Sequence, residues 1–386
     1  MKRVIIIVLD SVGIGNAPDA AAFGDEGANT LVNLSRAAGS LRMPNMQALG
    51  LGNILSGQIE GCPAVSAPAG SYGRMIEASN GKDTTIGHWE MAGIITTDPF
   101  PTFPDGFPIE FMQQWANDVG VEGWLCNLPA SGTEIVRQLG ELHCQTGLPI
   151  VYTSADSVFQ IAAHEEHFGL QRLYDICAHT RKMLDPLRVG RVIARPFVGE
   201  SADTFVRTAN RHDYSLVPPT PNALTLIRKA GCPVFSIGKI KDVFAGVGIS
   251  DAHPTRSNLE GMKLVIDALP CFANGLIFAN LVEFDSSFGH RRDTAGYARC
   301  LEEFDAALGE LIPRLAPNDL LLITADHGND PTFKGTDHTR EMVPLISFSP
   351  KRKSEDLGVR TTFADLGATA CAWLGAPMPK CGTPFV

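Results

Sequence analysis

The feature that most constrains the fold is the stretch at residues 320–338, LLLITADHGNDPTFKGTDH. It begins with an apolar run, residues 320–325, which is long enough for a strand buried on both faces. Asp326 and His327 follow this run at once, and His338 follows after a polar loop. In open α/β sheets, ligands bind at the carboxyl ends of the strands. The stretch therefore predicts a buried parallel strand with carboxylate and imidazole side chains at its ligand-binding edge.

Two further apolar runs end in a similar way. Residues 4–9 are followed by Asp10, and residues 276–282 are followed by Asp285 and His290. Each acid alone is typical of a helix cap, and each Asp-His pair alone of a solvated loop. Together, three aspartates and three histidines at one sheet edge are enough for two cations with three protein ligands each. Oxygen and imidazole donors without cysteine favour a divalent cation such as Mn²⁺, Zn²⁺ or Mg²⁺.

A pair of threonines stands at a predicted helix start. After a predicted strand at residues 71–78, the chain reads NGKDTTIGHWE at residues 80–90. Asp83, Thr84 or Thr85 would cap a helix that begins here. A helix N-terminus binds anions through its N–H groups and the positive end of its dipole. The motif is therefore typical either of a plain capping threonine or of a threonine that carries a covalent phosphate.

Two proline clusters divide the chain. Four prolines lie within residues 99–108, and three lie within residues 218–221. The segment between them is long enough for a small domain and contains both helical and strand-like patterns. The sequence therefore predicts an inserted α+β cap domain at residues 98–217, within a catalytic core formed by residues 1–97 and 218–386.

The second half of the predicted cap is rich in arginine. A surface arginine is usually only a solvated charge, but guanidinium groups are well shaped to bind phosphate. The chain carries a net charge of −10, so an anionic substrate has to be held by a local group of cations or by metal. One or two of these arginines could hold a substrate phosphate: Arg188, Arg191, Arg195, Arg207 and Arg211.

Composition excludes several classes of protein. The net charge of −10 and the lack of a Lys/Arg-rich block argue against nucleic acid as a partner. Nine scattered cysteines without a CxxC motif are typical of a reduced, cytoplasmic protein. The apolar run at residues 4–9 is too short for a secretory signal, and no window is long enough for a membrane span. The oligomeric state is left open.

Seven motifs resemble the phosphopentomutase family of alkaline phosphatase-like metalloenzymes: VLDSVGIG, GKDTTIGHWE, YTSADSVFQIAAHEE, GRVIARPFVGE, NRHDY, FDSSFGHRRD and TADHGNDPTFKGTDHTRE. The resemblance runs from residue 1 to about residue 375 and keeps the motifs in order. It implies an alkaline-phosphatase-like α/β core, with a central and mainly parallel sheet flanked by helices, and an inserted α+β cap domain.

The resemblance also implies a set of site residues. Six side chains would hold two Mn²⁺ ions: Asp10, Asp326 and His327 for one ion, and Asp285, His290 and His338 for the other. Thr84 matches the threonine that carries phosphate. Two residues match the strand end in the cap that contacts ribose, namely Ser154 and Asp156. Four arginines lie in segments that resemble the sugar-phosphate site: Arg191, Arg195, Arg207 and Arg211.

The implied activity is the interconversion of ribose 1-phosphate or deoxyribose 1-phosphate with the 5-phosphate, through a phosphothreonine and a bisphosphate. A metal-dependent phosphatase or phosphodiesterase on the same core, with water as the acceptor, is the main alternative. A cofactor-independent phosphoglycerate mutase would have a serine nucleophile and a longer chain. A non-catalytic metal-binding module would not need an intact nucleophile between two sets of ligands.

Overall fold

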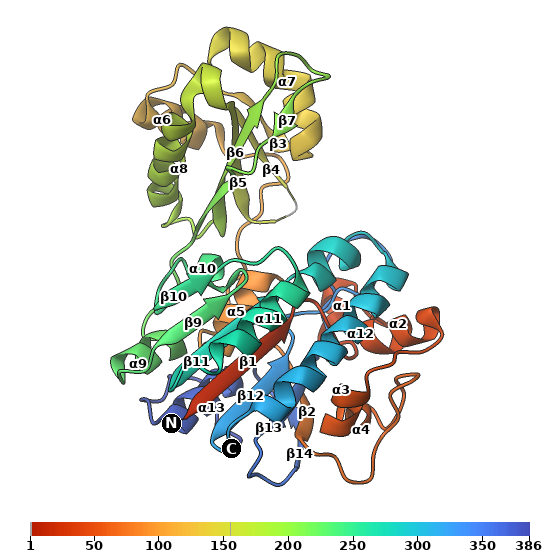
Figure 1. Ribbon diagram of the computed structural model, residues 1–386. Coiled ribbons are helices and arrows are strands. Elements are labelled where there is room, and N and C mark those ends of the chain that lie inside the picture. The colour runs from red at the N-terminus through yellow and green to blue at the C-terminus, as the bar shows by residue number, and fades with distance from the viewer. Residues whose placement is uncertain (1, 155) are drawn as a thin grey trace. The chain divides into compact units, whose positions relative to one another are not determined.

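The computed structural model describes residues 2–154 and 156–386, and the chain divides into two compact units (Figure 1). The unit called the core here comprises Met1–Pro99 and Pro218–Val386. The unit called the cap comprises Phe100–Val217, which is one continuous insertion between the two parts of the core.

The core is built on one large sheet. Its strands are β1 (Arg3–Leu9), β2 (Ser71–Met75), β9 (Val234–Ile237), β10 (Asp251–His253), β11 (Gly275–Leu281), β12 (Asp319–Thr324), β13 (Val343–Phe348) and β14 (Asp356–Arg360). They lie in the order β10-β9-β11-β1-β12-β13-β2-β14. The strands from β10 to β12 are mutually parallel, whereas β13 is antiparallel to both of its neighbours. The expected mainly parallel α/β sheet is therefore confirmed.

The three central strands of the sheet have apolar sequences throughout because they are buried. Every residue of β1, β11 and β12 is buried, so each strand is covered on both faces. The core helices are α1 (Ala20–Phe23), α2 (Thr30–Ala38), α3 (Pro44–Leu49), α4 (Leu51–Ile54), α5 (Thr84–Met91), α9 (Ala223–Lys229), α10 (Ile240–Val243), α11 (Asn258–Ala268), α12 (Thr294–Leu311) and α13 (Ala364–Leu374). Among them, α12 packs against α11, α2 and α3, and α13 packs against α9 and α5.

The cap has a sheet and an apolar interior of its own. Its strands are β3 (Leu125–Pro129), β4 (Ile150–Thr153), β5 (Val158–His164), β6 (Arg191–Val198), β7 (Val206–Arg207) and β8 (His212–Ser215). They follow the order β3-β4-β5-β6-β7, with β8 also paired to β6. The helices are α6 (Ile109–Val119), α7 (Gly132–Thr146) and α8 (Leu170–Leu184).

Two separate apolar clusters in the cap show that helices cover its sheet on both sides. One cluster includes Trp115 of α6, Phe159 of β5 and Ile176 of α8. The other includes Val136 of α7 and Phe197 of β6. In the part of the chain that the structure describes, no helix of either unit has the length and apolar character needed to cross a bilayer.

Candidate metal centre

The carboxyl ends of three neighbouring strands bring most of the predicted metal ligands together. β1 pairs in parallel with both β11 and β12, so Asp10, Asp285 and Asp326 follow strands that end at one edge of the sheet. Donor atoms of Asp10, Asp326 and His327 all lie within 4.8 Å of one another. The same holds for Asp285, His327 and His338. Two groups of ligating side chains thus share one imidazole, that of His327.

His290 lies at the exposed side of this cluster. Its Nε2 is 3.1 Å from Asp285 Oδ2, and its ring centroid is 4.8 Å from that of His338. Its Nδ1 is 2.7 Å from the carbonyl oxygen of Thr336, which fixes the orientation of the ring. The geometry groups Asp285 and His338 with His327, whereas the resemblance pairs them with His290. The assignment of each side chain to one of two ions therefore stays a prediction.

The buried carboxylates have oxygen atoms that the protein leaves without donors. Within the described residues, neither Asp10 Oδ1 nor Asp326 Oδ2 accepts a hydrogen bond, although both side chains are almost fully buried. The other oxygen of Asp326 accepts the backbone N–H of Ser11 at 3.0 Å. A buried carboxylate oxygen without a donor is costly unless a cation is beside it. The donor set therefore fits divalent cations.

The ionisable groups influence one another strongly when no cation is bound. Burial and the carboxylates of Asp326 and Asp285 raise the pKa of Asp10 to about 8. Burial also acts to raise the pKa of Asp326, but His327 and His88 outweigh it and lower that pKa to about 2. Burial lowers the pKa of His327 to about 4, which keeps this imidazole neutral and able to bind metal. A bound cation would take the place of the proton on Asp10.

Two buried asparagines hold the acids in place, and neither role is predictable from the sequence pattern alone. Asn280 donates from Nδ2 to Asp10 Oδ2 at 3.0 Å, and Asn329 donates to Asp285 Oδ1 at 2.8 Å. Such donors orient a carboxylate ligand and tune its affinity for metal. Asn280 carried a signal, because it is the one polar side chain in the apolar strand GLIFANL.

Thr84 is the first residue of α5, and its hydroxyl is directed at the ligand cluster. Its Oγ1 lies 3.2 Å from His327 Nε2. Asp83 caps the helix, because its Oδ1 accepts the backbone N–H of Thr85 at 2.9 Å and that of Ile86 at 3.1 Å. Of the two threonines, Thr84 is therefore the one whose hydroxyl contacts a predicted metal ligand.

His88 lies one helical turn after Thr84 and is a further buried polar residue beside the predicted ligands. It is fully buried, with its Nδ1 2.8 Å from the carbonyl oxygen of Thr84 and 3.3 Å from Asp326 Oδ2. Burial disfavours its charged form, but the carboxylates of Asp326 and Asp10 raise its pKa above the ordinary value. A Cβ at Gly87 would lie 2.2 Å from the carbonyl oxygen of Asp326, so only glycine allows α5 this close approach. The sequence offered one indication of this role, because a residue four positions after Thr84 lies on the same face of a helix.

Two predicted ribose contacts lie on one polar loop of the cap. Ser154 and Asp156 follow β4, and the backbone N–H of Asp156 donates to Ser154 Oγ at 3.3 Å. The carboxylate of Asp156 pairs with Arg191, where Oδ2 and Nη2 are 3.3 Å apart. Arg191 also lies 3.7 Å from the carboxylate of Asp213.

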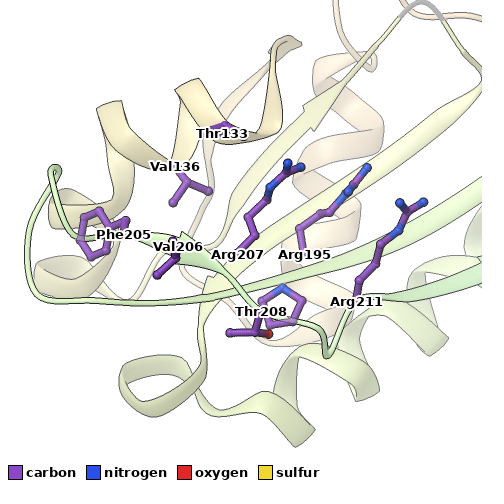
Figure 2. Close-up of a pocket in the computed structure, with 9 residues that line it drawn as sticks. Thr133, Val136, Arg195, Phe205, Val206, Arg207, Thr208 and Arg211 are labelled. Carbon is purple, nitrogen blue, oxygen red and sulfur yellow. The ribbon is translucent and has the colours of Figure 1, made fainter. Parts of the chain in front are cut away.

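The predicted phosphate-binding arginines do not all occupy one place. Arg188 lies over the ring of Phe100, with 5.9 Å from its Cζ to the ring centroid. The remaining three line a cavity in the cap (Figure 2): Arg195, Arg207 and Arg211.

Comparison with known proteins agrees with this architecture. Residues 2–378 match the model of the Metalloenzyme superfamily. The PH0037 protein from Pyrococcus horikoshii aligns with a TM-score of 0.51 at 14% identity, covering 97% of each chain. The phosphoglycerate mutase of Leishmania mexicana aligns with a TM-score of 0.50 at 13% identity, covering 99% of this chain and 97% of that one. At such low identity these two structures support the fold alone.

Relatives of much higher identity cover the whole chain. The phosphopentomutase of Symbiobacterium thermophilum is 55% identical over 387 residues, which span 100% of this chain and 98% of that protein. The phosphopentomutase of Syntrophotalea carbinolica is 52% identical and covers 95% of this chain and 93% of its own length. The protein is therefore an enzyme that belongs to the phosphopentomutases, a family of isomerases within the metalloenzyme superfamily.

Proposed function

We propose that this enzyme interconverts ribose 1-phosphate or deoxyribose 1-phosphate with the 5-phosphate, by way of phosphorylated Thr84 and a bisphosphate. The observation that carries the proposal is the 3.2 Å contact between the Thr84 hydroxyl and His327, inside a cluster of buried carboxylates and imidazoles. The names of the full-length relatives support the reaction and the class of substrate.

Two divalent cations, which we propose to be Mn²⁺, would occupy the cluster. The residues that would hold them are Asp10, Asp326 and His327 on one side, and Asp285, His290 and His338 on the other. Such ions neutralise the charge of a phosphate in transfer and favour the ionised form of a nearby hydroxyl. The shared position of His327 keeps the two groups of ligands close to each other and to Thr84.

Thr84 would act as the nucleophile and as the carrier of the phosphate. A free threonine hydroxyl is a weak nucleophile, and its location beside the ligand cluster provides the activation it needs. Asp83 caps α5 and His88 binds the carbonyl of Thr84, so both contacts hold the residue in one orientation. In the first transfer, a sugar hydroxyl attacks the phosphorus of phospho-Thr84. The bond from phosphorus to Thr84 Oγ1 breaks, Oγ1 takes up a proton in place of the one that the sugar hydroxyl loses, and the product is a bisphosphate.

The second transfer is the reverse reaction with the other phosphate of the bisphosphate. That phosphate returns to Thr84, and the isomerised monophosphate leaves. We propose that the cap recognises the sugar, with Ser154 and Asp156 as hydrogen-bonding partners of the ribose hydroxyls. A mutase also has to keep water away from the phosphothreonine, because hydrolysis would turn it into a phosphatase.

The test is to incubate the enzyme with ribose 1-phosphate and Mn²⁺ and to follow ribose 5-phosphate and free phosphate together. We expect isomerisation to be the faster reaction. In Asp156→Ala, isomerisation should fall more than hydrolysis, because sugar recognition is lost while the metal centre is intact. Asp118→Ala, which changes an exposed position on α6, serves as the matched control. If the wild-type enzyme releases phosphate faster than it isomerises the pentose, the phosphatase alternative is correct.

A further inference from the structure

Arg292 joins two segments of the core that carry predicted metal ligands. It follows the helical turn Phe284–Gly289, which contains Asp285, and it precedes α12. Its half-buried guanidinium group donates hydrogen bonds to five oxygen atoms. They are Oδ1 of Asn329 at 2.6 Å and the carbonyl oxygens of Gly335 at 2.6 Å, Asp330 at 2.9 Å, Gly289 at 3.2 Å and Asp337 at 3.3 Å. Four of these acceptors lie in the loop at residues 329–337, which leads directly to His338.

The contact with Arg292 decides which way the side-chain amide of Asn329 faces. An amide has an oxygen that accepts and a nitrogen that donates, whereas a guanidinium group can only donate. Because Arg292 Nη1 donates to Asn329 Oδ1, the amide nitrogen has to face the other way, where it donates to Asp285 Oδ1 at 2.8 Å. Without Arg292, the amide is free to turn and to place its oxygen against the carboxylate. Arg292 therefore acts on a predicted ligand through Asn329.

Arg292 also supports the peptide groups that orient His290. Because His290 Nδ1 lies 2.7 Å from the carbonyl oxygen of Thr336, Nδ1 carries the proton and Nε2 keeps the lone pair that binds metal. The residues on either side of Thr336 are Gly335 and Asp337, and their carbonyl oxygens accept from Nε and Nη2 of Arg292. The same guanidinium group thus fixes the backbone on both sides of the carbonyl that sets the tautomer of His290.

The backbone of Arg292 has an unfavourable conformation that these contacts maintain. Its φ is +55°, in the left-handed region that favours glycine over residues with a Cβ. Such a conformation persists where the surrounding contacts over-determine it, and it is frequent at functional sites. The neighbouring Arg291 is different, because its side chain is exposed and makes no hydrogen bond or ion pair with any residue that the structure describes. Of two adjacent arginines, only Arg292 is therefore built into the fold.

We propose that Arg292 is a positioning residue for the outer half of the metal centre, namely Asp285, His290 and His338. In the described part of the chain its guanidinium group donates to none of these three side chains. It acts on them through Asn329 and through the loop that leads to His338. The role depends on the planar guanidinium fork, because a single ammonium group cannot reach acceptors in several directions at once.

The remaining predicted ligands are supported by other groups. Asn280 donates to Asp10, and the backbone N–H of Ser11 donates to Asp326. Loss of Arg292 should therefore disturb one half of the centre and spare the other. That each half holds one divalent cation rests on the proposed function.

The test is a calorimetric titration of Mn²⁺ into the full-length enzyme after treatment with EDTA. The wild type should bind two ions, and Asp285→Asn identifies the binding phase that belongs to the outer half. In Arg292→Met this phase should weaken about 10–100-fold, as when a group that orients a ligand is removed, and the other phase should change by less than about twofold. Arg291→Met is the matched control, because it makes the same chemical change one residue away, and both phases should remain as in the wild type.

Two further variants separate the guanidinium fork from charge and from backbone strain. Arg292→Lys keeps the positive charge but loses the fork, so it should weaken the same phase nearly as much as Arg292→Met; it also carries the test if Arg292→Met does not fold. Arg292→Gly relieves the left-handed backbone, and it should still lose the same affinity because the contacts are gone. Wild-type affinity for both ions in a variant that melts earlier would show a purely structural arginine and overturn the positioning role.

The outcomes also distinguish the role of Arg292 from the proposed function. If the Mn²⁺-loaded wild type isomerises pentose phosphates but Arg292→Met and Arg291→Met bind Mn²⁺ equally well, the positioning role fails and the function stands. If Arg292→Met weakens the outer phase alone but the loaded wild type isomerises nothing, the positioning role stands and the function fails. Equal weakening of both phases would show that Arg292 supports the whole centre, which contradicts a role confined to the outer half.

Discussion

The raised pKa of Asp10 should make the stability of the metal-free enzyme depend on pH. The pKa of this buried carboxyl is raised from 3.8 to about 8 by burial and by Asp326 and Asp285. At neutral pH the folded state therefore keeps a proton that the unfolded state has lost. The stabilisation from this proton is fully present below about pH 4 and is lost as the pH rises through 8. The lowered pKa of Asp326 also contributes to stability, but that contribution is lost as the pH falls below about 4 and does not affect the neutral range.

The size of the effect follows from linkage. Between the unfolded-state pKa of Asp10, 3.8, and its folded-state pKa of about 8, each pH unit changes the free energy of unfolding by at most about 1.4 kcal/mol for one proton. From pH 5 to pH 8 the metal-free enzyme should therefore lose up to about 4 kcal/mol from this group. A bound cation should remove the effect, because it takes the place of the proton.

Urea unfolding of the EDTA-treated enzyme at pH 5, 6, 7 and 8 measures this loss. Asp10→Asn is the control, because its amide does not titrate, and its free energy of unfolding should fall less steeply with pH than that of the wild type. Calorimetric titration with Mn²⁺ in buffers of different ionisation enthalpy should show about one proton released at pH 7. Equal pH slopes for the wild type and Asp10→Asn, with no proton released, would refute the reasoning.

Three further changes test other parts of the structure. Thr84→Val should abolish isomerisation, and mass spectrometry should detect no phosphate on the peptide that contains residue 84. Thr85→Val should keep most of the activity and should still be phosphorylated at Thr84; the reverse result would move the nucleophile to Thr85. Asn329→Leu removes the side chain that donates a 2.8 Å hydrogen bond to Asp285, a predicted metal ligand. The affinity for Mn²⁺, measured by fluorescence or calorimetric titration, should fall about 10–100-fold. Unchanged affinity would argue against a ligand role for the Asp285 carboxylate. Arg3→Met breaks the buried ion pair in which Arg3 donates hydrogen bonds of 2.8 and 2.5 Å to Asp319. The free energy of unfolding, measured by urea denaturation, should fall by about 3–5 kcal/mol. A loss below about 1 kcal/mol would contradict this estimate.

The sequence predicted the centre of the core well because that centre depends on burial. The apolar runs at 4–9, 276–282 and 320–325 became β1, β11 and β12 with end shifts of about one residue. A strand covered on both faces has to be apolar throughout, so its sequence is distinctive. The direction of pairing was not predictable in the same way. The apolar run at residues 343–348 forms β13, but nothing in its composition shows that this strand lies antiparallel to β12.

Helix ends and supporting residues were harder to predict because other parts of the chain decide them. The α-helix α12 ends at Leu311, although leucine recurs at helical spacing as far as Leu315. A 3₁₀ turn that contains Pro313 follows, because proline cannot donate the next helical hydrogen bond. The roles of His88 and Asn329 were hard to predict, because their partners are far away in the sequence. Asn329 contacts Asp285, and His88 contacts Asp326 at the end of β12. Only the tertiary fold shows which buried polar groups meet.

The insertion of the cap has a consequence for the order in which a ribosome releases the parts of the fold. Strand β1 leaves the ribosome first, yet its two neighbours begin at Gly275 and Asp319. At a translation rate of about 5–20 residues per second, β12 is synthesised roughly 15–60 s after β1. The cap has all of its strands by Ser215 and can close its sheet during that time. A chain that stalls after the cap would therefore carry a folded cap beside an unpaired apolar strand, which is a ready template for aggregation.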